Sequence, residues 1–261
     1  MSRLVTEAGA DRRESGGQVL ARGLAILRLL VDARGPLTSK EIAAAAGIHQ
    51  SSASRILGTL ASAGYVRKVG YREFVPDYGV LALAERAADA FPLSHKPRAA
   101  VAATADECEG HLVSLAALWH GHLIYLVRME KGGEALSVSF DVIPLHLSSP
   151  ALRLLADLPD ENALEILRDS RARSGWARPS DRAPNDELEA LAKARELLTH
   201  DALVLDSWQA PDVMTAAIRV EAPGEPPTAL AISGRTGLVS HETVLLWLQA
   251  GRRRVEAALR D

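Results

Sequence analysis

Apolar residues recur at helical spacing near the start of the chain. Leu20, Leu24, Leu27 and Val31 follow one another at intervals of four, three and four residues, so a helix would carry them on one face. The Gly-Pro pair at 35–36 ends this pattern. We therefore expect a helix from about residue 18, preceded by a polar lead over residues 1–17 that we expect to be disordered.

Three further elements follow at short intervals. Thr38 precedes Glu41 by three residues, which is the pattern of a capping box, so a second helix is expected to begin directly after the threonine. Gly47 favours the left-handed conformation that ends a helix. A third helix is expected over residues 49–63, and two short β-prone runs within residues 65–75 predict a hairpin.

The third helix has two different sides. Its apolar residues fall within one arc of about 100°, and they are Ala53, Ile56, Leu57 and Leu60. A separate arc offers short polar side chains and one guanidinium. Two helices joined through a glycine and followed by a basic hairpin predict a winged helix-turn-helix, whose second helix enters the major groove of DNA.

The residues predicted to contact DNA come from this polar arc and from the hairpin. Glutamine can pair with adenine, arginine with guanine or phosphate, and serine with bases or phosphates. The set is Gln50, Ser51, Ser52, Ser54 and Arg55 on the helix and Arg67, Lys68 and Arg72 on the wing. The alternative is a solvated face of a small helical bundle, but such a face would usually carry Lys and Glu where this one carries Ser and Gln.

The pattern changes after the hairpin. A helix is expected over residues 78–90, and prolines at 92 and 97 mark a linker. Strands are then expected at 112–119, 123–129, 135–142, 202–206, 213–222 and 228–233, and helices at 97–109, 149–157, 161–170, 186–199 and after Ser240. Strands in two groups with helices between them predict an α+β domain around an antiparallel sheet.

Chain length and charge agree with two domains. A length of 261 residues exceeds the usual size of one domain. Residues 1–80 hold 11 Lys and Arg against 7 Asp and Glu, whereas the rest of the chain holds 19 against 26. A basic N-terminal part on an acidic body suggests a separate module that binds a polyanion. We expect this DNA-binding domain over 18–77, a linker helix over 78–96 and the second domain over 97–261.

Composition argues against membrane and secreted classes. Apolar residues make up 48% of the chain, yet no run of about 18 of them exists, so no membrane span is expected. The N-terminus lacks the apolar segment of a secretory signal. Cys108 is the only cysteine, so no internal disulfide can form. We therefore expect a cytoplasmic protein.

Metal and catalytic motifs are incomplete. Cys108 and His111 lack a second pair of ligands, and the segment from His241 has a leucine where a zincin helix needs its second histidine. No nucleophile elbow, phosphate-binding glycine loop or dinucleotide fingerprint is present. We expect no metal, no cofactor and no enzymatic activity. The alternative is an enzyme that turns over a small acid, with the N-terminal unit serving only for assembly.

Five segments, in order and at the same spacing, resemble the IclR family of bacterial transcription regulators. They are VLARGLAILRLL, LTSKEIAAAAGIHQSSASRILGTLASAGYV with its wing, IPLHLSSPALRLLADLP, LVLDSWQAPDVMTAAIRV and ALAISGRTG. The resemblance implies an N-terminal winged helix-turn-helix, a linker helix and a GAF-like or PAS-like effector-binding domain. It also implies homodimers or dimers of dimers on palindromic double-stranded operators, with a small metabolite that switches DNA affinity.

Single residues carry this resemblance into the DNA-binding segment. Arg55 stands where the family has an arginine in its recognition helix, and Ser51 and Ser52 stand where Ser-Thr is common. Gln50 replaces a frequent lysine. In the second domain, His146 matches the histidine of a Pro-Leu-His segment.

The effector loop departs from the family pattern. The usual glycine and lysine are missing from residues 147–152, where Pro150 fixes φ and removes an amide donor. The resemblance implies a pocket that suits a small polar organic metabolite such as a carboxylate. Its predicted residues are Met129, Leu147, Ser148, Ser149, Asp206, Thr215 and Ser233. A regulator of the same fold that has lost its ligand response is the alternative.

Overall fold

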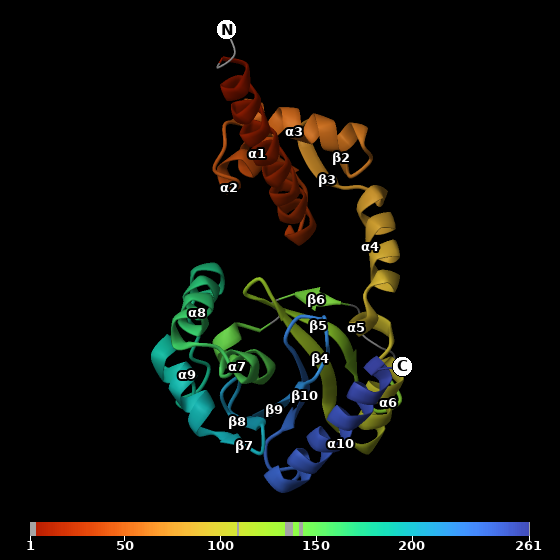
Figure 1. The fold of residues 1–261 in the computed structure, drawn as a ribbon, viewed down its shortest axis with the longest axis vertical. Helices are drawn as coiled ribbons and strands as arrows, with labels where there is room; N and C mark the ends of the chain where they lie inside the picture. Colours follow the sequence, from red (N-terminus) through yellow and green to blue (C-terminus); the bar gives the residue numbers. More distant parts are fainter. Residues whose placement is uncertain (1–3, 109, 134–137, 141–142, 261) are drawn as a thin grey trace. The chain divides into compact units, whose positions relative to one another are not determined.

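A computed structural model describes residues 4–108, 110–133, 138–140 and 143–260 (Figure 1). The chain divides into two compact units, Met1–Ala90 and Phe91–Asp261. The first unit has one hydrophobic core, and the second has a core on each face of its sheet. The predicted α+β fold class is confirmed, with a winged helix-turn-helix followed by an antiparallel-sheet domain.

The first unit combines four helices with a small sheet. Its elements are α1 (Leu4–Asp32), β1 (Leu37–Thr38), α2 (Ser39–Ala45), α3 (Gln50–Ser62), β2 (Val66–Val69), β3 (Glu73–Pro76) and α4 (Tyr78–Ala90). Strand β3 pairs antiparallel with both β1 and β2, which gives the order β1-β3-β2. The β2–β3 wing turns at Gly70, whose φ of 62° lies in the left-handed region that glycine adopts without strain.

Local sequence sets the start and the end of α2. The backbone amide of Thr38 donates to Glu41 Oε2 at 2.8 Å, and the amide of Glu41 donates to Thr38 Oγ1 at 3.3 Å, so the capping box is formed. The hydrogen bonds from Thr38, chiefly that of its backbone amide, hold the pKa of Glu41 below its ordinary value. Gly47, with φ of 62°, follows the helix and lets the chain turn into α3.

The buried face of α1 is not the predicted one. Leu20 and Leu24 are 66% and 60% exposed, whereas Ile26 and Leu30 are fully buried against Ile56 and the rest of the first core. The two apolar stripes are separated by about 110° around the helix. Both are apolar, so periodicity alone could not choose between them. Packing against α3 selects the stripe of Ile26 and Leu30.

Helix α1 also begins earlier than expected. It starts at Leu4, within the lead over 1–17 that the sequence suggested would be disordered. The first proline of the chain is Pro36, so no residue before it removes a helical hydrogen bond. The glycines in this stretch weaken a helix by about 1 kcal/mol each but do not end it.

The second unit is a seven-stranded antiparallel sheet between two layers of helices (Figure 1). The strand order is β6-β5-β4-β10-β9-β8-β7. The strands are β4 (Leu112–Trp119), β5 (His122–Met129), β6 (Ser139–Phe140), β7 (Leu198–Thr199), β8 (Ala202–Asp206), β9 (Val213–Val220) and β10 (Thr228–Arg235). The helices are α5 (Pro92–His95), α6 (Arg98–Glu107), the 3-10 turn η1 (Leu145–Leu147), α7 (Ser149–Leu155), α8 (Asp160–Ser174), α9 (Glu187–Glu196) and α10 (His241–Arg260).

The helices cover the two faces of this sheet unequally. Residues of α6 and α10 pack on one face with Leu115, Ile218 and Leu230. Residues of α7, α8 and α9 pack on the other face with Leu123 and Leu203. We call these the α10 face and the α7 face.

Two strands differ from the sequence expectation. Leu198 and Thr199 were expected to end a helix, but α9 ends at Glu196 and they form the edge strand β7. His200 and Asp201 both have positive φ, 49° and 68°, which is the pattern of the tight turns that join hairpin strands. Of the strand expected over 135–142, the structure describes Ser139–Phe140 as β6, and residues 135–137 and 141–142 lie outside the described residues.

Strand β5 contains an irregularity that matters for the site. Leu115 of β4 pairs with Val127, but the next residue, Ala116, pairs with Tyr125, so Leu126 is an extra residue in β5. This is a β-bulge. Tyr125 packs in the core of the α7 face, whereas Val127 packs in that of the α10 face. The bulge therefore shifts the alternation of side chains along the strand.

Candidate nucleic-acid interface and ligand pocket

Helix α3 presents its polar arc to solvent. Ala53, Ile56 and Leu57 are buried, and on the other side Gln50, Ser51, Ser54 and Arg55 are exposed while Ser52 is half-buried. Gln50 Nε2 donates to Ser39 Oγ at 3.3 Å. Arg55 has no ion pair among the residues that the structure describes. The arc therefore offers hydrogen-bonding groups and one guanidinium that is not held by an acidic side chain of the described chain.

The wing carries a cluster of cations around an aromatic ring. Tyr71 at the turn is 81% exposed, and its ring lies 4.9 Å from the Arg72 guanidinium carbon and 6.0 Å from Lys68 Nζ. Arg67 Nε lies 4.0 Å from Asp77 Oδ1, with its side chain still more than half exposed. Such contacts position the cations at the surface without neutralising them.

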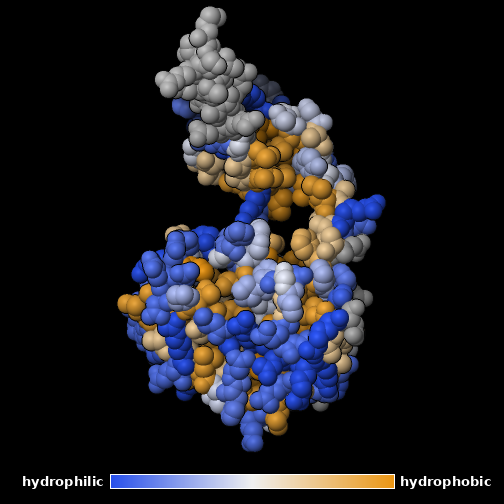
Figure 2. All heavy atoms as spheres, in the orientation of Figure 1, coloured by the Kyte–Doolittle hydropathy of each residue, from blue (hydrophilic) through white to orange (hydrophobic). Residues whose placement is uncertain are grey.

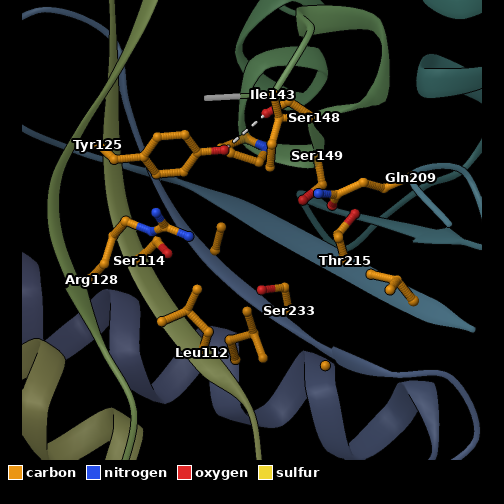
Figure 3. Close-up of a pocket in the computed structure, with 15 residues that line it drawn as sticks. Leu112, Ser114, Tyr125, Arg128, Ile143, Ser148, Ser149, Gln209, Thr215 and Ser233 are labelled. Carbon is orange, nitrogen blue, oxygen red and sulfur yellow. Dashed lines mark hydrogen bonds between the residues drawn. The ribbon is translucent and has the colours of Figure 1, made fainter. Parts of the chain in front are cut away.

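A cavity of about 300 Å³ opens on the α7 face of the large sheet (Figure 3). It is bounded by β4, β5, β9 and β10 and by the start of α7. Its described lining is Leu112, Ser114, Tyr125, Arg128, Ile143, Ser148, Ser149, Pro150, Gln209, Val213, Thr215, Ala231, Ile232, Ser233 and Gly234. Apolar walls with a few convergent polar groups are typical of a site for a small organic ligand.

Comparison with known proteins identifies the N-terminal segment. A family model described as the IclR helix-turn-helix domain matches residues 19–70. Residues 19–70 are therefore an IclR-type helix-turn-helix segment. No curated protein matches the chain significantly. A helix-turn-helix is a DNA-binding module, so the match agrees with the DNA-binding class predicted for this segment.

Solved structures match the fold of this chain over both units. An IclR family transcriptional regulator from Brucella abortus is 21% identical, with a TM-score of 0.75 over 93% of this chain and 90% of that one. A putative IclR transcriptional regulator from Silicibacter sp. is 17% identical, with a TM-score of 0.72 over 92% and 96%. An IclR homologue from Microbacterium hydrocarbonoxydans complexed with 4-hydroxybenzoate is 19% identical, with a TM-score of 0.64 over 93% and 99%.

Four of the predicted effector residues lie together in the cavity. They are Ser148, Ser149, Thr215 and Ser233. The other three do not line it. Met129 packs in the core of the α10 face, and Leu147 is buried in η1. Asp206 lines a different cavity, of about 740 Å³, where its Oδ2 lies 2.6 Å from His241 Nε2.

Strand alternation explains where Asp206 and Met129 lie. Leu205 packs in the core of the α7 face, so the next residue, Asp206, points to the α10 face. Met129 follows the bulge and shares the α10 face with Val127. The sequence motif gives the position of each residue along its strand but not the sheet face to which its side chain points. Neither side chain could therefore be placed from the motif.

The sequence prediction missed four polar residues of the cavity. These are Ser114, Tyr125, Arg128 and Gln209. Regular alternation along β4 could have placed Ser114 on the same face as Ala116, which packs in the core of the α7 face. No such signal exists for Arg128, because it lies three positions after Tyr125 and the bulge is not visible in the sequence.

Several polar atoms of the cavity have no partner within the described chain. Tyr125 Oη and Ser148 Oγ are 3.4 Å apart, and Ser148 Oγ also accepts from the amide of Ala151 as the cap of α7. In contrast, Ser149 Oγ, Thr215 Oγ1 and Arg128 Nε are buried without a hydrogen-bond partner. Buried polar groups are normally paired, so unpaired groups in a cavity point to a bound ligand or water.

Pro150 does not disturb the backbone beside the cavity. It is the second residue of α7, within the first turn that follows the Ser148 cap. The amides of a first helical turn have no partner within the helix, so a proline there loses no helical hydrogen bond. The family departure at this position is therefore compatible with a formed pocket wall.

His146 anchors a loop next to the cavity wall. Its ring stacks on Trp176 at a centroid distance of 3.8 Å, and its Nε2 lies 2.8 Å from the carbonyl oxygen of Ala177. Trp176 Nε1 in turn donates to the carbonyl of Pro184 at 3.0 Å. Burial lowers the pKa of His146, although the hydrogen bond to Ala177 opposes this effect. The native state therefore favours the neutral imidazole.

We expect this histidine to make stability depend on pH. An unfolded imidazole titrates near pH 6.5, and the folded one at a lower pH, so the unfolded state binds more protons between these values. The free energy of unfolding should therefore fall as pH is lowered through this interval. Above the interval, His146 should contribute no pH dependence. Chemical denaturation from about pH 5 to 7.5 would measure the slope.

A His146→Gln variant is the control for this effect. It keeps a side-chain group that can hydrogen-bond but cannot titrate, so its unfolding free energy should change less with pH than that of the wild type. Equal slopes for the two proteins would assign the pH dependence to other groups.

Proposed function

We propose that this chain is an IclR-type transcriptional regulator that binds a double-stranded operator through α3 and the wing, and that a small organic ligand in the α7-face cavity changes its operator affinity. The observation that carries the proposal is a cavity in which Ser149 Oγ, Thr215 Oγ1 and Arg128 Nε are buried without partners. A regulator without an effector would have no need of such groups, since each costs free energy when it is left unpaired.

In the DNA complex, α3 would lie in the major groove. Short side chains such as Ser51 and Ser54 allow the helix to approach the base edges, in a groove about 12 Å wide. Gln50 suits adenine, and Arg55 suits guanine or a phosphate. Arg67, Lys68 and Arg72 would hold phosphates from the wing and so fix the register of α3 without reading sequence.

The effector would act by favouring one of two arrangements of the regulator. A ligand shifts such an equilibrium only if it binds the two arrangements with different affinity. The relative from Microbacterium hydrocarbonoxydans is complexed with 4-hydroxybenzoate, so a small aromatic carboxylate is the first ligand to test here.

A homodimer on a palindromic operator fits this arrangement. Figure 2 shows apolar surface on the first unit, where α1 exposes Val19, Leu20, Leu24 and Val31. An apolar groove of about 290 Å³ runs along this stripe beside Leu60 of α3. A second copy would cover it and would set two α3 helices about 34 Å, or a multiple of it, apart.

Selection from random-sequence DNA tests the proposal without knowledge of the operator. The full chain should enrich an inverted repeat, and gel shifts on that repeat should change midpoint when 4-hydroxybenzoate or another stabilising ligand is added. Recovery of no defined sequence would contradict operator recognition. An operator whose affinity no stabilising ligand changes would instead favour a regulator that has lost its response.

The wing cations should make operator binding strongly dependent on salt. Each phosphate neutralised contributes about 0.9 to the slope of log affinity against log salt. Replacing Arg67, Lys68 and Arg72 together by Ala should therefore lower that slope by about 2 to 3. Fluorescence anisotropy from about 50 to 300 mM salt would measure the slope.

Arg86→Ala is the matched control, because Arg86 is an exposed cation of α4 that lies 3.9 Å from Glu85. It should leave the slope unchanged. If the triple wing variant kept the wild-type slope, the wing cations would not be phosphate contacts.

A further inference from the structure

We propose that Arg128 binds an anionic group of the effector, so that the cavity selects small monoanions with a hydrogen-bonding group at their opposite end. This inference rests on the proposed function of the cavity as the effector site. It adds the residue that would recognise the charge and the orientation of the ligand.

The β-bulge of β5 brings the guanidinium to the cavity. Tyr125 and Arg128 are three residues apart, and in a regular strand such residues point to opposite faces. Because Leu126 is an extra residue in β5, Arg128 instead lies on the same face as Tyr125. Its guanidinium carbon lies 5.1 Å from the centre of the Tyr125 ring, and both side chains line the cavity (Figure 3).

Arg128 supplies the charge of the described cavity lining. It is the only charged side chain among the described residues that line the cavity, and those residues include no Asp or Glu. Its Nε is buried and has no hydrogen-bond partner in the described part of the chain. A partly desolvated cation without an opposite charge is costly, and a carboxylate can satisfy a guanidinium with two parallel hydrogen bonds.

The other end of the cavity is polar but uncharged. Figure 3 shows Ser149, Thr215 and Gln209 grouped opposite Arg128. Ser149 Oγ and Thr215 Oγ1 are buried and without partners, so each can donate to or accept from a hydroxyl or carbonyl oxygen. Leu112, Ile143 and Val213 add apolar surface to the lining.

The size of the cavity limits the ligand. A volume of about 300 Å³ is at the lower end of the range for organic ligands. One guanidinium can neutralise one anionic group, and no second cation among the described lining residues is available for a dianion. We therefore expect monocarboxylates to bind, and amines and dicarboxylates to bind weakly.

Paired acids and amides test the inference by direct binding. Propionate, lactate, benzoate and 3-hydroxybenzoate would each be titrated calorimetrically into the full chain beside the matching carboxamide. We expect at least one acid to bind about 10- to 100-fold more tightly than its amide, since a hydrogen bond to a charged group is among the stronger ones. Equal affinities for acid and amide, or no binding of any acid, would overturn the inference.

Variants of Arg128 test whether this residue causes the preference for the acid over the amide. Arg128→Met should lower acid affinity about 10- to 100-fold and leave amide affinity nearly unchanged, and Arg128→Lys should recover part of the acid affinity. Arg235→Met is the control, because Arg235 is an exposed arginine of β10 that does not line the cavity. Acid affinity that is unchanged by Arg128→Met would also overturn the inference. If Arg128→Met does not fold, the comparison of acid and amide in the wild type still decides the question.

Operator binding separates this inference from the proposed function. If an acid binds through Arg128 but leaves operator affinity unchanged, the inference stands and effector control fails. If neutral ligands bind the cavity and change operator affinity, effector control stands and the inference fails.

Discussion

Replacing Arg55 by Ala is expected to weaken operator binding by about 10- to 100-fold. Arg55 lies on the exposed arc of α3, opposite the buried Ala53, Ile56 and Leu57, so the substitution should leave the core unchanged. No acidic side chain among the described residues pairs with its guanidinium. The guanidinium can therefore bind DNA without first breaking an ion pair with a described residue. Fluorescence anisotropy on the selected operator would measure the loss.

Arg55→Lys distinguishes two modes of contact. If Arg55 binds only a phosphate, lysine keeps most of the affinity, because it carries the same charge. If Arg55 binds a guanine edge, lysine loses affinity for the operator and relaxes the preference for one base pair. Unchanged operator affinity in Arg55→Ala, with an unchanged melting temperature, would rule out contact between this arc and DNA.

Replacing Gly79 by Ala is expected to destabilise the first unit by about 1 to 3 kcal/mol. Alanine normally stabilises a helix relative to glycine, but here the sign should reverse. A Cβ on Gly79 would lie 2.4 Å from the carbonyl oxygen of Gly64 and 2.9 Å from its carbonyl carbon. The same oxygen accepts from the Gly79 amide at 3.0 Å. Because the obstacle is backbone, α4 would have to shift from the end of α3.

Two optical signals can separate this effect from general loss of stability. All four tryptophans lie after residue 118, in the second unit, so tryptophan fluorescence follows that unit while circular dichroism follows both. Gly79→Ala should shift the dichroism transition in urea and leave the fluorescence transition in place.

Gly58→Ala is the control, since a Cβ at this exposed position of α3 meets nothing within 4 Å. It should leave stability unchanged or raise it by up to about 1 kcal/mol. A Gly79→Ala protein as stable as Gly58→Ala would contradict the close approach of α4 to Gly64.

Local sequence signals predicted the bounds of α2 in the first unit, but they did not predict which face of α1 is buried. Thr38, Glu41 and Gly47 act within a few residues, so their effects on α2 could be read directly from the sequence. The buried face of α1 could not, because it carries two apolar stripes and only the tertiary contact with Ile56 decides between them. Propensity and periodicity describe a helix by itself, whereas burial depends on its partner.

The same limit applies to the candidate pocket. Hydroxyl residues near a family motif, such as Ser148 and Thr215, were found because the motif fixes their place in the chain. Asp206 was misplaced because its strand face depends on how β8 pairs with β9. Arg128 was missed because an irregularity in pairing, and not a residue type, turns it toward the cavity.

The extra residue in β5 has a consequence for how relatives should be aligned. Deleting Leu126 would restore ordinary alternation and would still leave Tyr125 and Arg128 on one side of the sheet. A gap opposite this position would therefore keep the arginine on the cavity side of the sheet, although an ungapped alignment would suggest that it had changed sides. For proteins of this fold, strand length and side-chain direction need to be compared separately before a ligand is transferred from one protein to another.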